Sequence, residues 1–110
     1  MTSTSDSDYL SHCRAFLAPM KRRPRMFFSS LPELETMMHG HSVAFLQLGL
    51  IPDESAAFNY RFRDWLLDRE KCSTASGWAL AVENLAAQQV GVSAVTLFFD
   101  LVTEFLESVD

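Results

Sequence analysis

The chain has 110 residues, of which 48% are hydrophobic and 21% are charged, and its 14 acidic and 9 basic side chains give a net charge of −5. A chain of this length and composition buries roughly 65% of its unfolded surface, which excludes disordered, fibrous and low-complexity classes. We expect one domain, residues 1–110, in which residues 1–5 are flexible.

The start of the chain and its apolar runs bear on where the protein resides. Residues 1–8 are polar, with no basic stretch followed by an apolar one, so a standard signal peptide is not expected. The longest apolar runs, such as residues 78–82, hold about five residues, whereas a membrane span needs about 18. The sequence therefore predicts a cytoplasmic protein with no membrane partner.

The first predicted helix lies near the N-terminus. Its apolar residues recur at intervals of three and four, which is typical of a helix with one buried face. This face comprises Tyr9, Leu10, Cys13, Phe16, Leu17 and Met20. Cys13 is therefore expected in the core, and with only one other cysteine, Cys72, the chain cannot build a disulfide framework.

The second predicted helix carries signals at both ends. Ser30 should cap its start, with Glu33 completing a capping box, and Gly49 should supply a left-handed stop. The buried face is expected to comprise Leu34, Met37, Met38, His41, Phe45 and Leu48. Gly40 costs about 1 kcal/mol inside a helix, so it predicts either the close approach of another helix or a bend.

Three further helical patterns follow, each with one apolar face. The third helix, after residues 53–55, should bury Phe58, Phe62, Trp65 and Leu66 and expose Asn59. The fourth, from residue 78 to about residue 89, should bury Trp78, Val82, Leu85 and Ala86. The last should bury Val95, Phe98, Phe99, Val102, Phe105, Leu106 and Val109. Because no window alternates with the period of a strand, the sequence predicts an all-α fold, a compact bundle of about five helices.

Histidines, cysteines and carboxylates are the candidates for catalysis or metal binding. His39 and His41 point about 200° apart on a helix, so they cannot share a metal ion, and His41 should be a neutral, hydrogen-bonded core residue. Cys13 follows His12, but helical neighbours diverge by about 100°. Three carboxylate pairs are interpreted as solvated helix faces: Glu33/Glu35, Asp64/Asp68 and Glu104/Glu107. We therefore expect no enzyme, no metal ion and no cofactor. A pocket that brings His39 or His41 beside Cys72 or a buried carboxylate would favour an enzyme instead.

The densest charge feature consists of Lys21, Arg22, Arg23 and Arg25. Pro24 keeps Arg23 out of the helical conformation, so the segment should be a connector. Such cations can bind phosphates, which makes a nucleic-acid-binding or regulatory module the alternative function, although no recognition helix accompanies them. The competing interpretation is internal, because residues 83–110 hold five acidic and no basic residues, which predicts that the bundle pairs this connector with the last helix.

The excess of negative charge suits a basic protein partner, which it would steer electrostatically. The candidate partner-binding residues are Asp64, Asp68, Glu104 and Glu107, on the polar faces of the third and last predicted helices.

Five short motifs lie between residues 23 and 105. They are Arg23-Pro24-Arg25-Met26-Phe27, His39-Gly40-His41, Phe62-x-x-Trp65-Leu66-x-x-x-Arg69, Ser76-Gly77-Trp78 and Phe98-Phe99-x-Leu101-x-x-Glu104-Phe105. With these motifs the chain resembles the small helical bacterial immunity proteins of interbacterial (polymorphic) toxin systems. The resemblance implies a non-enzymatic protein that binds a cognate toxin in the cytoplasm of the producing cell and blocks its active site or its access to substrate. It assigns no binding residue, and it leaves the oligomeric state open.

Overall fold

The computed structural model describes residues 6–109, with side chains from residue 8 onward, so the flexibility expected of residues 1–5 lies outside the described residues. Its helices are α1 (Asp6–Arg22), α2 (Leu31–Gln47), α3 (Phe58–Glu70), α4 (Trp78–Ala87) and α5 (Ala94–Ser108), with two short 3₁₀ helices, η1 (Pro24–Met26) and η2 (Glu54–Ala56). Residues 6–109 contain no strand, and the predicted all-α bundle of five helices is confirmed. Among the described helices, none is both long and apolar enough to cross a membrane.

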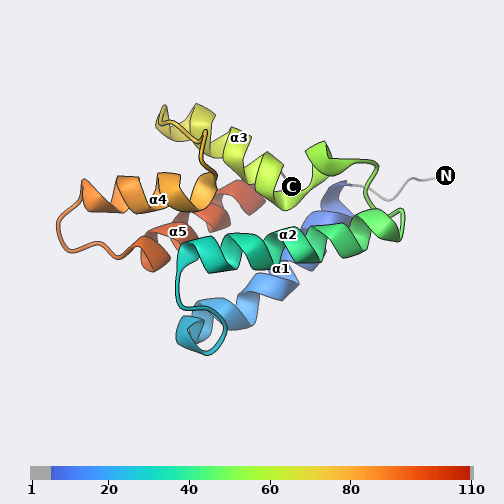
Figure 1. Ribbon diagram of the computed structural model, residues 1–110, viewed down its shortest axis with the longest axis horizontal. Helices are drawn as coiled ribbons and strands as arrows, with labels where there is room; N and C mark the ends of the chain where they lie inside the picture. Colours follow the sequence, from blue (N-terminus) through green and yellow to red (C-terminus); the bar gives the residue numbers. More distant parts are fainter. Residues whose placement is uncertain (1–5, 110) are drawn as a thin grey trace.

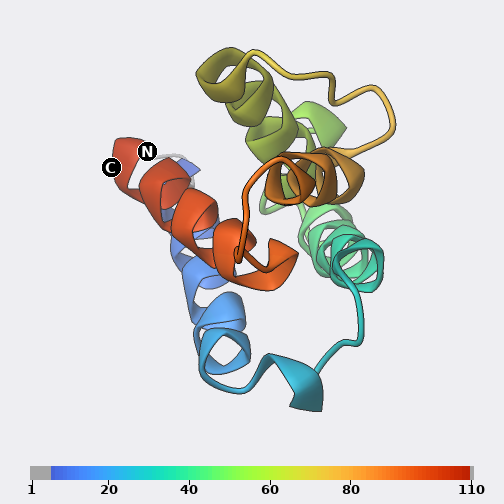
Figure 2. The same cartoon turned by 90° about the vertical axis from the view of Figure 1, so that its left-hand side faces the viewer.

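The five helices pack in two groups around one core. Figures 1 and 2 show α1 beside α5, while α2, α3 and α4 cover the other side, with α4 in contact with α2, α3 and α5. The largest fully buried side chains at the centre are aromatic: Phe58, Phe62, Trp78, Phe98 and Phe105. Trp78 stacks on Phe98, with ring centroids 4.8 Å apart, so α4 and α5 are joined by one of the largest apolar contacts available.

The predicted core cysteine lies on α1, and a histidine of α2 packs against aromatic rings of α1 and of its own helix. Cys13 is fully buried as expected, and burial raises the pKa of its thiol to about 11. His41 is half-buried, with its ring centroid 4.3 Å from that of Phe16 and 4.8 Å from that of Phe45. Its Nδ1 is buried without a hydrogen-bond partner among the described residues, so the predicted hydrogen bond is not formed at this nitrogen.

Both ends of α2 form as the sequence predicts, except that the capping box is displaced by one residue. The Ser30 hydroxyl accepts a hydrogen bond from the Glu33 amide at 3.3 Å, which confirms the cap. The Glu33 carboxylate accepts from the Ser29 amide at 2.9 Å, so the box closes one residue before the cap. Gly49 has a φ of 73°, and the next amide, of Leu50, donates to the Phe45 carbonyl, so the left-handed stop is confirmed.

One expectation for the helix faces is wrong, and one of the two explanations offered for Gly40 is excluded. Leu48 is 72% exposed rather than buried, because α2 ends at Gln47 and the chain turns away. A Cβ placed on Gly40 would meet no atom of a neighbouring element within 4 Å, so of the two alternatives for Gly40 the close approach of another helix is wrong. The third helix follows residues 53–55 as predicted: the Asp53 carboxylate accepts from the Ser55 amide and caps η2, and α3 begins at Phe58.

Candidate functional site

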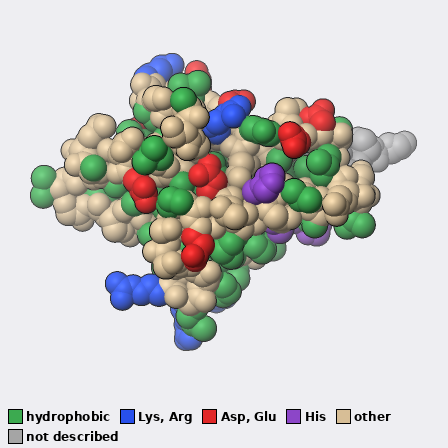
Figure 3. Space-filling model, viewed as in Figure 1, with side chains coloured by type: hydrophobic (Ala, Val, Ile, Leu, Met, Phe, Trp, Pro, Cys, Tyr) green, Lys and Arg blue, Asp and Glu red, His purple; other side chains and the backbone are tan. Residues whose placement is uncertain are grey.

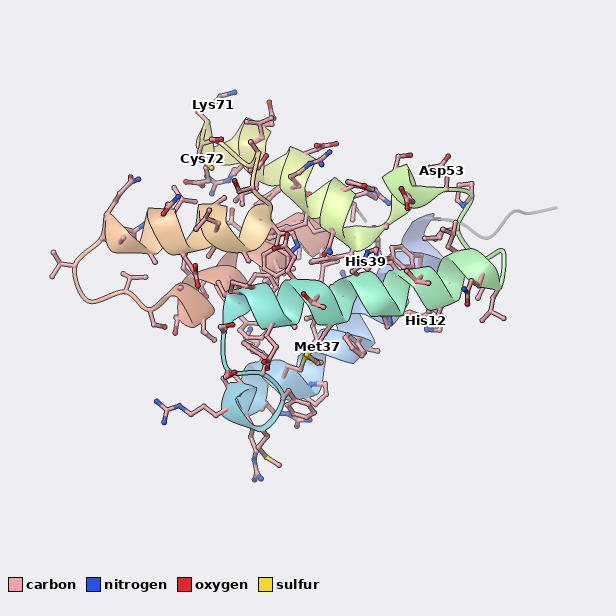
Figure 4. The ribbon with its side chains drawn as sticks, in the orientation of Figure 1. His12, Met37, His39, Asp53, Lys71 and Cys72 are labelled. Carbon is pink, nitrogen blue, oxygen red and sulfur yellow. The ribbon has the colours of Figure 1, made fainter. Side chains whose placement is uncertain are left out.

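A cavity of about 370 Å³ opens between α2 and α3, and we call it the α2–α3 groove. Its α2 side consists of Glu35, Thr36, His39, Ser42, Val43 and Leu46, and Figure 4 shows His39 on the side of α2 that faces α3. These positions repeat with the period of a helix, so one face of α2 forms the wall over about 16 Å. Asn59, Tyr60 and Arg63 of α3 form the opposite side.

One end of the groove is built by a carboxylate that caps a helix. Glu35 Oε2 accepts a hydrogen bond from the Trp78 amide at 3.1 Å, at the first residue of α4. The N-cap residue of α4, Gly77, has no side chain to do this, and its φ of 98° is a conformation that favours glycine. A Cβ at Gly77 would lie 2.5 Å from Glu35 Oε2. The carboxylate therefore sits where only a glycine leaves room for it, and it meets the positive end of the helix dipole.

The position of Glu35 changes its acidity. Burial raises the pKa of this carboxyl, and hydrogen bonds from the backbone amides of Trp78 and Ala79 act in the opposite direction. No described cation forms an ion pair with Glu35. The interpretation of Glu33/Glu35 as a solvated pair is therefore wrong for Glu35, which is half-buried and holds α4 against α2.

Asn59 links the same three helices. Its amide nitrogen donates to the Glu35 carbonyl at 3.0 Å, and its amide oxygen accepts from the Trp78 indole at 2.8 Å. The prediction that Asn59 faces solvent is wrong. Sequence reasoning missed both Glu35 and Asn59, although one signal was present: α4 begins after a glycine, which can offer no side-chain cap of its own.

The groove carries more negative than positive charge. Arg63 donates from Nε and Nη2 to Asp64 Oδ1 at 3.2 and 3.1 Å, and its guanidinium lies 4.8 Å from the centroid of the Tyr60 ring. Glu54 borders the other end of the groove, beside Ile51, and pairs with no described cation. Since Arg63 and Asp64 neutralise each other, Glu35 and Glu54 give the groove a negative excess.

The structure does not bring the four acidic candidates together. Asp64 pairs with Arg63, and Asp68 lies 3.6 Å from Lys71, both at the exposed surface of α3. Glu104 pairs with Arg69 at 2.8 Å and joins α5 to α3. Glu107 instead borders a shallow hollow between α1 and α5, opposite Lys21. Figure 3 shows acidic side chains scattered over the face that it presents rather than gathered in one patch.

The cationic residues form a separate feature, the cationic projection, which we define as residues 21–27. Figures 1 and 3 show it protruding from one end of the molecule. Lys21, Arg22, Arg23 and Arg25 are all exposed, and none forms an ion pair with a described acidic residue. The predicted pairing with the last helix is therefore wrong, because η1 turns the segment outward while Glu104 contacts α3. Met26 and Phe27 are exposed beside the cations, and Phe28 is buried and anchors the segment.

The structure also separates the residues that could have formed a nucleophilic or metal site. His39 and the half-buried Glu35 carboxylate both border the α2–α3 groove, whereas Cys72 borders a different hollow, at the far end of α3 (Figure 4). Burial and the nearby Glu70 raise the pKa of the Cys72 thiol, which disfavours the thiolate. Across the described part of the chain, no three histidine, cysteine or carboxylate side chains converge as metal ligands would.

Comparisons with protein-family models, with curated proteins and with solved structures gave no match. The features that bear on function are those of the fold itself: a closed aromatic core, the α2–α3 groove and the cationic projection.

Proposed function

We propose that the chain is a non-enzymatic protein-binding module, and specifically an immunity protein that binds and neutralises a cognate bacterial toxin. The proposal of a protein-binding module rests on three polar groups of the α2–α3 groove, each of which is held in place by another residue of the chain. The Glu35 carboxylate caps α4, the Asn59 amide holds Glu35 and Trp78, and the Arg63 guanidinium is paired with Asp64. Because these groups are fixed by contacts within the chain, they present a pre-organised surface, which supports recognition of a partner.

Two further features support a protein partner. The groove is mostly apolar with a few fixed polar groups, which is typical of a preformed binding site. The net charge of −5 favours fast association with a basic partner. The toxin-specific part of the proposal rests on the resemblance to immunity proteins, and two residues of those motifs, His39 and Gly77, border the groove.

The test is neutralisation followed by direct binding. Each gene that flanks the coding sequence in its native genome is expressed alone and together with this chain, and a product that is toxic only when alone is purified for calorimetry. We expect 1:1 binding that the variant Thr36→Arg, inside the groove, weakens at least ten-fold. Thr96→Arg is the matched control, because Thr36 and Thr96 are both exposed helical threonines whose hydroxyls form local hydrogen bonds. Absence of any neutralised toxin among the flanking products would count against the immunity function.

The acidic helix faces are the second candidate surface for the same partner. Charge reversal at two or three of Asp64, Asp68, Glu104 and Glu107 should weaken binding while the far-UV circular dichroism spectrum stays unchanged. The pair Asp68→Lys and Glu107→Lys is the cleanest choice, because among the described residues neither forms an ion pair with another helix and neither lines the groove. Unchanged affinity for the toxin would remove these faces from the interface and leave the groove.

The cationic projection supports a second function, a nucleic-acid-binding or regulatory module. The specific observation is that its four cations are exposed and form no ion pair within residues 6–109. Fluorescence anisotropy with a labelled 20-base-pair duplex should then show binding whose logarithmic salt dependence has a slope of about −0.9 per phosphate contacted. Arg23→Gln with Arg25→Gln should make that slope shallower by nearly two. No binding at 50 mM salt would exclude this function.

A further inference from the structure

The α2–α3 groove carries two carboxylates for which the described residues supply no cation. Glu35 lies at the end of the groove where Gly77 begins the turn into α4. Glu54 lies at the other end, in the connection after α2, and Figure 4 labels its neighbour Asp53 near the C-terminal end of that helix. Arg63, the cation on the groove wall, is held by Asp64 and forms no ion pair with either carboxylate. The groove is therefore complementary in charge to a cationic ligand.

Apolar side chains contribute much of the surface between the two carboxylates, beside polar ones such as His39 and Ser42. Val43, Leu46, Ile51, Ala57 and Ala75 contribute to it, and Tyr60 adds an aromatic edge. An arginine side chain combines the two matching parts, because its methylene stem packs on apolar surface while its guanidinium forms bidentate hydrogen bonds with a carboxylate. Lysine fits less well, since an ammonium group is more strongly hydrated and is harder to move into a partly buried site.

The state of Glu35 points in the same direction. Its carboxylate is half-buried, and burial raises the pKa of the group because the charge loses solvation. Hydrogen bonds from the backbone amides of α4 compensate for only part of that lost solvation. The Trp78 amide, for example, donates to one of the two carboxylate oxygens, Oε2. A guanidinium arriving at this end would supply the missing countercharge.

The length of the groove indicates how the arginine is presented. The α2 wall from Glu35 to Leu46 extends about 16 Å, which is also the span of about five residues of extended chain. We propose, building on the function proposed above, that the α2–α3 groove binds an extended segment of the protein partner that places an arginine against Glu35 and a second arginine, about four residues away, against Glu54.

The test uses the full chain and two synthetic probes. One is the blocked pentapeptide Ac-Arg-Ala-Leu-Ala-Arg-NH₂, and the other has citrulline at both ends, which keeps the shape and removes the charge. We expect amide chemical-shift changes along residues 35–46 and 57–63 in a nuclear magnetic resonance titration, with at least ten-fold tighter binding of the arginine peptide. Equal affinities, shifts confined to other helices, or no binding of either peptide at 10 mM would overturn the proposal.

Single-residue variants test whether the two groove carboxylates cause the preference for the arginine peptide. Glu54→Gln and Glu35→Gln should each reduce the preference for the arginine peptide at least three-fold, and the glutamine at position 35 keeps an oxygen that can accept from the Trp78 amide. Asp100→Asn is the control, because it changes the net charge equally at an exposed site of α5 outside the groove. If Glu35→Gln fails to fold by circular dichroism, Glu54→Gln alone decides, and an unaltered preference in that variant overturns the assignment.

The peptide experiment and the neutralisation experiment fail independently. A chain that neutralises a toxin but does not distinguish the two peptides loses the arginine assignment and keeps its proposed function. A chain that distinguishes the peptides through Glu35 and Glu54 but neutralises no flanking product keeps a basic-segment binding site and loses the immunity function.

Discussion

The backbone amide of Trp78 donates a hydrogen bond to the carboxylate of Glu35, 43 residues earlier in the chain, so a side chain of α2 caps the first turn of α4. The first turn of α3 is also capped by a side chain of another helix. The Phe58 amide donates to the Tyr9 hydroxyl at 2.8 Å, and that hydroxyl also contacts Ser42 Oγ at 2.8 Å. Neither Ala57 nor Gly77, the N-cap residues of these helices, provides a side-chain cap. Capping from a distant helix ties formation of α3 and α4 to formation of the bundle.

Gly77→Ala should destabilise the protein by about 1–3 kcal/mol, because alanine is strained at a φ of 98° and its Cβ would displace the capping carboxylate. Gly40→Ala is the opposite case, since Gly40 is exposed in the middle of α2 with open space around it, and it should stabilise by about 0.5–1 kcal/mol. Urea unfolding followed by circular dichroism measures both. Effects of the same sign at the two glycines would contradict this description of Gly77.

Tyr9→Phe should cost about 1–3 kcal/mol of unfolding free energy. The change removes the acceptor of the Phe58 amide and leaves that amide buried without a partner, while Ser42 keeps its bond to the Met38 carbonyl. Tyr60→Phe is the matched control, because the Tyr60 side chain is exposed, and it should change stability by less than about 0.5 kcal/mol. Comparable losses in the two variants would show that the Tyr9 hydroxyl has no special role.

Phe98→Ala should cost about 3–5 kcal/mol, enough to unfold much of a marginally stable domain, because Phe98 is fully buried against Trp78 and Phe62. Trp65→Ala should cost less, since Trp65 is only half-buried at the edge of the same cluster. Thermal and urea unfolding rank the two variants. A larger loss for Trp65 would mean that the face of α3 is rotated from the one described.

Stability should fall as the pH drops below about 6.5, in part through His41. Burial, and then the nearby charge of His12, lower the pKa of His41 from its ordinary value of 6.5. The unfolded chain therefore takes up a proton at a higher pH than the folded chain, so the loss begins near 6.5 and continues down to the folded pKa. His41→Phe should flatten the profile of unfolding free energy between pH 7.5 and 5, whereas His12→Gln should reduce its slope only in part. A profile for His41→Phe that matches the wild type would exclude this contribution.

The sequence by itself determined the helices and most of their buried faces. Ser30 and Gly49 mark the two ends of α2, and a three-and-four spacing of apolar residues places Cys13, Phe62 and Phe98 in the core. These features could be predicted because they depend on residues within one or two turns of each other, where backbone hydrogen bonding and side-chain direction repeat with the helix. Where the chain turns after Gln47, the same periodicity failed, and Leu48 became exposed.

Only the tertiary structure decided how the helices lie against one another, and with that the site. Tyr9, Glu35 and Asn59 find their partners 49, 43 and 19 residues away, and the α2–α3 groove exists only because α2 and α3 pack with η2 and the loop before α4 at its ends. An apolar stripe indicates that a face is covered and does not indicate by which helix. Polar residues such as Glu35 and Asn59, whose role is to contact another helix, therefore look like ordinary surface residues until the helices are assembled.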